Sequence, residues 1–245
     1  MAKTDGEIKR RGRPPRSSNA SLVPQQIVEM SLEVVNERGL DGFSVRDVAR
    51  RLGVYPTALY HHFPGGRNEL LANVASLAFV DVAPELPADG EWTSWLRELF
   101  RRYRASLHRF PNLAPLLGAQ LVSNAGVNPA LVERILCVLE LAGFEDQKLI
   151  DAYNAVVAAL LGYVTLELAP MPADDPQGWA SQLEKNVRNL EPEAYPTIHR
   201  HMEILANRAF IVRWQSGRQR PLESGFSFYV ETMIAGLQRL SMTPD

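Results

Sequence analysis

The sequence predicts an all-α fold. Apolar residues recur at helical spacing through most of the 245 residues, and no stretch alternates between apolar and polar residues as a half-buried strand does. Clusters of proline and glycine separate the periodic segments. The run 44–63 predicts two short helices joined by a tight turn. We expect a disordered basic arm over 1–20, a three-helix unit over 21–68 and a larger helical domain over 69–245.

The first sixteen residues are rich in Lys and Arg and have almost no bulky side chains, so we expect them to form a mobile basic arm. Within it, Arg11-Gly12-Arg13-Pro14 matches the core of the AT-hook, in which an extended Arg-Gly-Arg lies in the narrow minor groove of A·T-rich DNA. An ordinary solvated tail is the alternative. Because a helix-turn-helix pattern follows, we favour DNA contact by Arg11 and Arg13.

Two helices are expected before the tight turn. The first ends at Arg38-Gly39, a basic residue followed by a glycine stop. The second begins at Ser44, whose hydroxyl can accept hydrogen bonds from the first backbone amides, and Asp47 favours the positive end of the helix dipole. Its apolar face packs inward and its arginines face solvent or phosphate.

The second helix of the helix-turn-helix follows a turn at Gly53, which can take a positive φ at low cost, and Pro56 suits its first turn. Aromatic, hydroxyl and imidazole groups at a solvent-facing helix start suit a DNA major groove. The candidate contacts to base edges are Arg46, Tyr55, Pro56, Thr57, Ala58 and His61. The candidate phosphate contacts are Tyr60, His62 and Arg67, and Ser44 completes the DNA-binding set. A core role for Tyr60 and a helix-end cap for His62 are the alternatives.

This segment closely resembles the TetR family of transcriptional repressors. The residues that carry the resemblance are a capped helix, Leu52-Gly53-Val54, then Leu59-Tyr60-His61-His62-Phe63, and Leu70-Leu71 soon after. The sequence departs from the family at Pro64-Gly65-Gly66-Arg67, where a short polar linker with a lysine is usual. Farther along, 139–144 and Ala235-Gly236-Leu237 look like the branch that includes the tetracycline repressors.

The resemblance implies a homodimer in which two C-terminal helices of each chain pair with their copies in a four-helix bundle. It also implies a small-molecule inducer that occupies a cavity in the C-terminal helices and releases the dimer from its operator. Two helix-turn-helix units in one dimer predict an inverted-repeat operator. Tetracycline-type repressors hold a magnesium-bound drug with histidines, but this chain has none between His62 and His108. We therefore expect an inducer other than magnesium-tetracycline.

The larger domain is expected to contain seven helices. The segment 151–168 is apolar on most faces, and with the apolar residues of the last helix it offers more surface than one chain covers, which indicates a partner subunit. The expected helices span 92–109, 113–123, 129–141, 146–168, 179–190, 197–215 and 224–240. The candidate ligand-binding residues, chosen as aromatic or amide groups on the middle helices together with one leucine, are Phe79, Trp92, Trp95, Phe100, Tyr103, Leu116, Gln120, Asn154 and Trp179.

Composition narrows the function class. The net charge is −2, yet residues 1–70 hold eleven Lys or Arg against eight Asp or Glu, so positive charge gathers around the helix-turn-helix. The single Cys137 allows no intrachain disulfide. No apolar stretch reaches the roughly 20 residues of a membrane helix and no secretory signal is visible, so we expect a cytoplasmic protein without a membrane partner.

No catalytic motif is present: there is no Walker loop, G-x-S-x-G or H-E-x-x-H, and we expect neither an enzyme nor a cofactor. His199 and His201 lie two residues apart and point to different sides of a helix, so no metal site is expected. The sequence therefore predicts a DNA-binding transcriptional regulator, a repressor with a small-molecule inducer. A constitutive or nucleoid-associated DNA-binding protein, and a helical enzyme or adaptor, remain alternatives.

Overall fold

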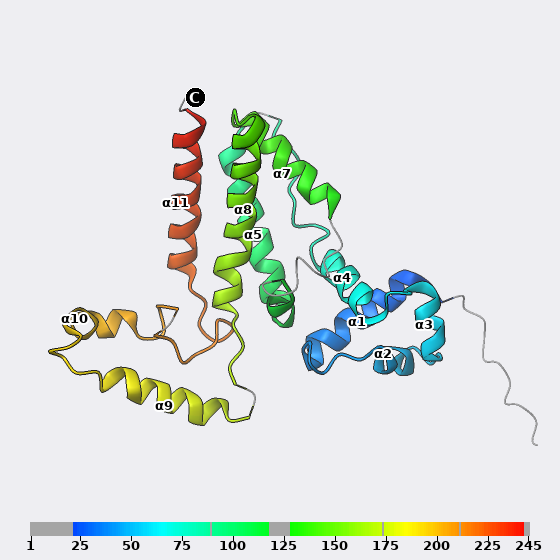
Figure 1. Ribbon diagram of the computed structural model, residues 1–245, viewed down its shortest axis with the longest axis horizontal. Helices are drawn as coiled ribbons and strands as arrows, with labels where there is room; N and C mark the ends of the chain where they lie inside the picture. Colours follow the sequence, from blue (N-terminus) through cyan, green and yellow to red (C-terminus); the bar gives the residue numbers. More distant parts are fainter. Residues whose placement is uncertain (1–21, 89, 118–127, 173, 211, 243–245) are drawn as a thin grey trace, which may run out of the picture.

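The computed structural model describes residues 22–88, 90–117, 128–172, 174–210 and 212–242, and every regular element within these ranges is helical. Figure 1 shows the N-terminal helices grouped beside an upright bundle, and a further helical segment extends from the bundle on the opposite side. The expectation of an all-α fold is confirmed.

The N-terminal helices surround a small apolar core. Ile27, Val34, Leu59 and Leu70 are fully buried and come from three of the four helices. The last helix of the group also packs on the first, which ties the unit to the rest of the chain. The helices are α1 (Pro24–Arg38), α2 (Val45–Arg51), α3 (Pro56–His62) and α4 (Gly66–Ala78).

The tight turn between α2 and α3 has the predicted geometry at Gly53, whose φ is +69°. The amide of Val54 donates to the Ala49 carbonyl at 3.0 Å and so closes the turn. Ser44 stands at the N-cap position of α2, but its hydroxyl makes no capping hydrogen bond, contrary to our expectation. The amides of Asp47 and Val48 instead donate to the backbone carbonyl of Ser44, at 3.0 and 3.2 Å.

The bundle is built from long helices that bury their apolar faces against one another. In it α5 packs against α7, α8 and α11, and α8 packs against α7 and α11 (Figure 1). The outlying pair, α9 and α10, buries only Met202. These elements are α5 (Trp92–Arg109), the short 3-10 helix η1 (Pro111–Leu113), α7 (Pro129–Leu141), α8 (Asp146–Glu167), α9 (Pro176–Arg188), α10 (Pro196–Leu205) and α11 (Glu223–Ser241).

Two predicted helices differ from the structure. The helix expected over 197–215 ends at Leu205, because Asn207 takes a left-handed φ of 57° and its side-chain oxygen accepts from the amides of Trp214 and Gln215, both at 2.9 Å. These contacts fold the segment after α10 into a loop. The helix expected over 113–123 is preceded by η1, and residues 118–127 lie outside the described ranges.

The helix α8 is long and apolar enough, by length and composition, to cross a membrane, because a stretch of 18 residues within it has a mean hydropathy of 1.6. Our expectation that no stretch qualifies was therefore too strict. Such a helix is also what the centre of a helical bundle requires, since Ala152, Val156, Leu160 and Val164 are buried within the chain. Only 33% of this stretch is buried within the chain, so other parts of α8 can pack against another molecule.

Candidate functional site

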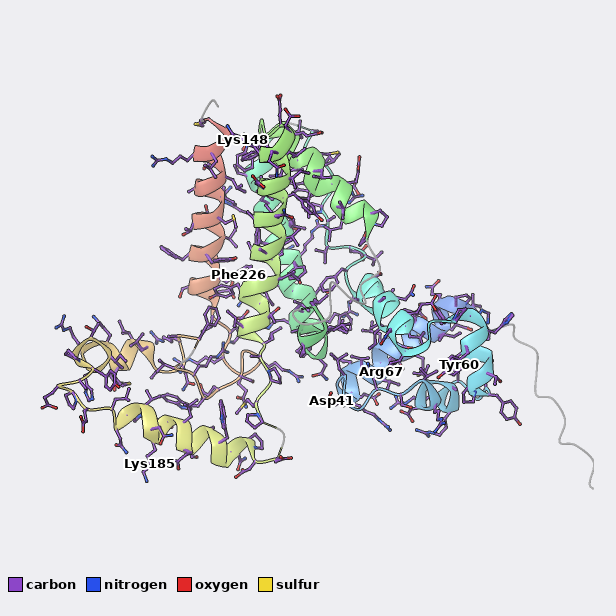
Figure 2. All side chains as sticks on the ribbon, in the orientation of Figure 1. Asp41, Tyr60, Arg67, Lys148, Lys185 and Phe226 are labelled. Carbon is purple, nitrogen blue, oxygen red and sulfur yellow. The ribbon has the colours of Figure 1, made fainter. Side chains whose placement is uncertain are left out.

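The start of α3 presents polar and aromatic side chains to solvent. Tyr55 is 82% exposed and Tyr60 is 48% exposed, and Thr57 and His61 are also exposed. Figure 2 shows α3 on the outer side of the N-terminal unit, with Tyr60 on it. Pro56 and Ala58 are half-buried, so they lie at the edge of this surface.

The opposite side of α3 is anchored in the core. Leu59 is fully buried and Phe63 nearly so. The ring of Tyr60 lies against Gly66, where an added Cβ would come within 3.0 Å of the ring and where φ is +61°. Glycine at this departure from the family pattern therefore lets the α3–α4 connection pass close to the tyrosine.

Asp47 pairs with some of the arginines on and near α2. The Asp47 carboxylate lies 3.0 Å from Arg38 and 3.6 Å from Arg51, and it accepts a hydrogen bond from Arg50. The hydrogen bond from Arg50 is the main reason that the pKa of Asp47 is lowered. Arg46 is exposed, and it forms no ion pair within the described ranges. Arg46 is therefore the α2 guanidinium that is available to an external anion.

Arg67 is engaged inside the protein. One of its nitrogens donates to the carbonyl oxygen of Leu40 at 2.8 Å, and its guanidinium lies 5.9 Å from the centre of the Phe43 ring. These contacts join α4 to the α1–α2 connection, and Figure 2 places Arg67 close to that connection. His62 is half-buried with its ring edge toward His61, at 5.7 Å between centroids. Arg11 and Arg13 lie outside the described residues.

A cavity of about 270 Å³ lies among α4, α5, α7 and α8. Its walls are apolar except for two tyrosines, a serine and an asparagine. The Phe79 and Tyr103 rings are stacked, with 5.0 Å between centroids and 12° between planes. The lining residues are Ala75, Ser76, Phe79, Tyr103, Leu117, Asn128, Leu131, Val132, Ile135, Tyr153, Val157, Leu160 and Leu161.

Of the eight predicted ligand-binding residues that the structure describes, Phe79 and Tyr103 line this cavity and the other six do not. Trp95 is buried, and its indole nitrogen donates to the Pro84 carbonyl at 3.2 Å, whereas Phe100 packs its edge on Tyr229. Trp92 and Leu116 pack in or against the core, Asn154 is exposed on α8, and Trp179 is 37% exposed on the outlying α9. Gln120 lies outside the described residues.

The lining residues that the sequence did not single out are mainly aliphatic. Leu131 and Ile135 lie one turn apart on α7, and Val157 and Leu161 lie one turn apart on α8. That spacing marks one face of each helix, and it was the available signal. Within the described ranges no group of three or more His, Cys, Asp or Glu side chains is arranged to hold a metal ion.

The helices α8 and α11 lie side by side and carry exposed apolar side chains (Figure 1). The Phe226 ring of α11 lies 5.5 Å from the Tyr163 ring of α8. Figure 2 labels Phe226 between these two helices. The exposed side chains are Ile150 (47%) and Leu166 (55%) on α8, and Phe228 (76%) and Leu240 (59%) on α11. Exposed apolar side chains do not stabilise a monomer, so this surface of α8 and α11 indicates an interface.

Two family models match the chain in succession. The model described as bacterial regulatory proteins, tetR family, matches residues 27–74, which cover most of α1, all of α2 and α3, and most of α4. The model described as tetracyclin repressor-like, C-terminal domain, matches residues 83–240, which hold the bundle and the outlying pair.

Known proteins agree with these models. The chain is 27% identical to the HTH-type transcriptional repressor DrrR1 of Streptomyces coeruleorubidus over 201 residues, 76% of this chain and 71% of that protein. It is 31% identical to the class A tetracycline repressor protein of transposon 1721 from Escherichia coli over 157 residues, 60% of this chain and 68% of that protein.

The fold is also found among solved structures. The crystal structure of the TetR family protein ActR of Streptomyces coelicolor, in complex with (S)-DNPA, superposes with a TM-score of 0.69 at 22% identity and covers 91% of this chain and 100% of that one. The chain therefore belongs to the tetR family of bacterial regulatory proteins, and it is a DNA-binding transcriptional repressor controlled by a small-molecule ligand rather than an enzyme.

Proposed function

We propose that the protein binds an inverted-repeat operator as a homodimer, with α3 in the major groove, and that a molecule in the α4–α5–α7–α8 cavity releases it. The observation that carries the proposal is the pairing of an exposed, polar α3 face with a cavity whose wall includes α4. Operator binding also implies that the protein works in the cytoplasm.

The DNA contacts follow from the exposed groups. Tyr55, Thr57 and His61 can reach base edges, and Arg46 is an exposed cation on the preceding helix. Base contacts of this kind select the sequence, while phosphate contacts supply much of the affinity. Because Arg67 is bonded to the Leu40 carbonyl, we assign it first to positioning α4, and contact with phosphate would use its remaining nitrogens.

Coupling between the two sites runs through α4. Ala75, Ser76 and Phe79 at its C-terminal end line the cavity, and the same helix packs on α1 in the helix-turn-helix unit. A ligand that fits the cavity in only one orientation of α4 therefore shifts the orientation of α3. Near-complete release requires the ligand to favour the released state by about 5.5 kcal/mol.

Operator architecture tests the first half of the proposal. DNase footprinting should show two protected half-sites related by a twofold axis, with centres roughly 34 Å apart or a multiple of that distance. A single asymmetric half-site would contradict the dimeric arrangement.

A filled cavity tests the second half and separates a regulated repressor from a constitutive DNA-binding protein. Val132→Trp on α7 places a large side chain in the cavity, whereas Glu133→Trp puts the same side chain on the exposed face of the same helix. Both variants should bind the operator. Compounds from a thermal-shift screen should release the Glu133→Trp protein but not the Val132→Trp protein, and equal release of both would place the ligand elsewhere.

A further inference from the structure

The polar groups of the cavity are few, and two of them already form hydrogen bonds within the protein. The Ser76 hydroxyl donates to the Ala72 carbonyl at 3.1 Å. The side-chain oxygen of Asn128 accepts from the Leu131 amide at 3.1 Å and so caps α7. The two remaining hydroxyl groups belong to Tyr103 and Tyr153.

The two tyrosines differ in exposure. Tyr153 is half-buried, so water can serve its hydroxyl. Tyr103 is only 5% exposed, and its hydroxyl oxygen is buried with no hydrogen-bond partner among the described residues. Burial raises the pKa of Tyr103, so the hydroxyl keeps its proton and remains a donor. A buried donor without an acceptor is costly, and native proteins rarely leave one unsatisfied.

We propose that the ligand of this cavity is a neutral, flat, ring-containing molecule with a hydrogen-bond acceptor to which the Tyr103 hydroxyl donates. This inference rests on the cavity being the ligand site of the proposed function. It adds the chemical class of the ligand and the residue that orients it.

The absence of charged side chains from the walls supports a neutral ligand. No Asp, Glu, His, Lys or Arg is among the residues that the structure places around the cavity. A carboxylate, phosphate or ammonium group that enters this cavity would lose its hydration without gaining a counter-charge. This transfer costs far more free energy than the transfer of a neutral group. The same residues include no carboxylate for a magnesium ion, which is usually bound by carboxylates and water.

The stacked aromatic pair supports a flat, ring-containing ligand. The stacked rings of Phe79 and Tyr103 contribute aromatic surface to the cavity, and aliphatic side chains from α7 and α8 complete the lining. A flat ring system can pack on such an aromatic surface, and its carbonyl oxygen can reach the Tyr103 hydroxyl once the side chains that bury this group move aside. Pockets of this composition typically take their affinity from apolar contact and their orientation from one or two polar groups.

Three probes with one ring skeleton test the class. Fluorene has no acceptor, fluorenone adds a carbonyl, and fluorenone carboxylate adds a charge to the ketone. In isothermal titration of the full-length dimer, fluorenone should bind about three- to tenfold more tightly than fluorene, the value of one hydrogen bond. The carboxylate should bind more weakly than either.

Two tyrosine variants test the orienting residue. In Tyr103→Phe the ring and its stacking are kept, so fluorene should bind as before while fluorenone loses its advantage. In Tyr153→Phe, the matched control in the same cavity, the advantage should remain. An advantage that survives Tyr103→Phe, or disappears in Tyr153→Phe alone, would overturn the assignment.

The outcomes also separate this inference from the proposed function. Tight binding of the carboxylate, with release of the operator, would overturn the ligand class but leave ligand-controlled repression intact. If none of the three probes binds, the ligand class is overturned, while the footprint and the Val132→Trp comparison still decide the proposed function.

Discussion

The Arg104 guanidinium of α5 donates two hydrogen bonds to the Glu167 carboxylate of α8, from Nε to Oε2 and from Nη2 to Oε1, both at 2.9 Å. The Glu167 side chain is fully buried, and it also accepts from the Leu222 amide at 2.7 Å, just before α11 begins. Arg104 reaches on to Glu223 at 2.6 Å. One buried carboxylate thus joins α5, the end of α8 and the start of α11.

This arrangement predicts a stability loss in Glu167→Gln. Removing one charge of a buried pair costs about 3–5 kcal/mol, and we expect the lower end because Glu223 still faces Arg104. Glu231→Gln is the control, since Glu231 pairs with Arg97 while 57% exposed and such pairs contribute about 1 kcal/mol or less. Urea unfolding followed by circular dichroism measures both, and equal losses would contradict a special role for Glu167.

The same pair predicts a pH dependence. Burial works to raise the pKa of Glu167, but hydrogen bonds from Arg104, His108 and Leu222 outweigh it and lower the value from 4.5 to about 2. A carboxylate with a lowered folded-state pKa stabilises the fold above pH 4.5 and loses that contribution as the pH falls toward 2. The difference in unfolding free energy between wild type and Glu167→Gln should therefore shrink over this window. A constant difference would show that charge is not its source.

DNA recognition should depend on Arg46 and Thr57. Arg46→Ala and Thr57→Ala should each weaken operator binding by roughly 1–3 kcal/mol without lowering the melting temperature, because both side chains are exposed. Lys185→Ala on α9 removes a charge far from α3 (Figure 2) and should leave affinity unchanged. Fluorescence anisotropy with a labelled operator gives the comparison. If both variants bind like wild type, the base contacts lie elsewhere.

Local signals predicted the ends of several helices, whereas tertiary packing determines which side chains line the cavity. The spans expected for α5 and α7 agree with the structure at both ends, because proline and glycine clusters stop the helical pattern there. The stop after Leu205 was missed, since it depends on Asn207 binding amides seven and eight residues later. Aromatic identity alone did not show which side chains would face a cavity, so Trp95 and Phe100 were predicted there but pack in the core.

The basic arm should add minor-groove affinity. Replacing Arg11 and Arg13 by Ala should abolish a preference for A·T-rich DNA beside the half-sites and reduce the slope of log affinity against log salt by about 1.8, or about 0.9 for each phosphate that is no longer neutralised. Replacing Lys3 and Lys9 by Ala removes the same charge but should keep the A·T preference. Operators with A·T-rich and G·C-rich flanks, titrated at several salt concentrations, distinguish the two. An unchanged preference in the arginine variant would make the arm a solvated tail.

Dimerisation should depend on the outer face of α11. Phe228 is 76% exposed, and burial of such a side chain between subunits is worth about 1.5–3 kcal/mol in each of two symmetric copies. Phe228→Glu replaces this apolar contact with a buried carboxylate that faces the same carboxylate of the partner subunit, so the dimer should dissociate. Operator affinity should then fall, because a monomer can bind only one half-site. Val80→Glu makes the same change at a side chain that is 66% exposed just beyond α4, and it should stay dimeric. Sedimentation equilibrium measures both, and a Phe228→Glu dimer as tight as wild type would move the interface away from α11.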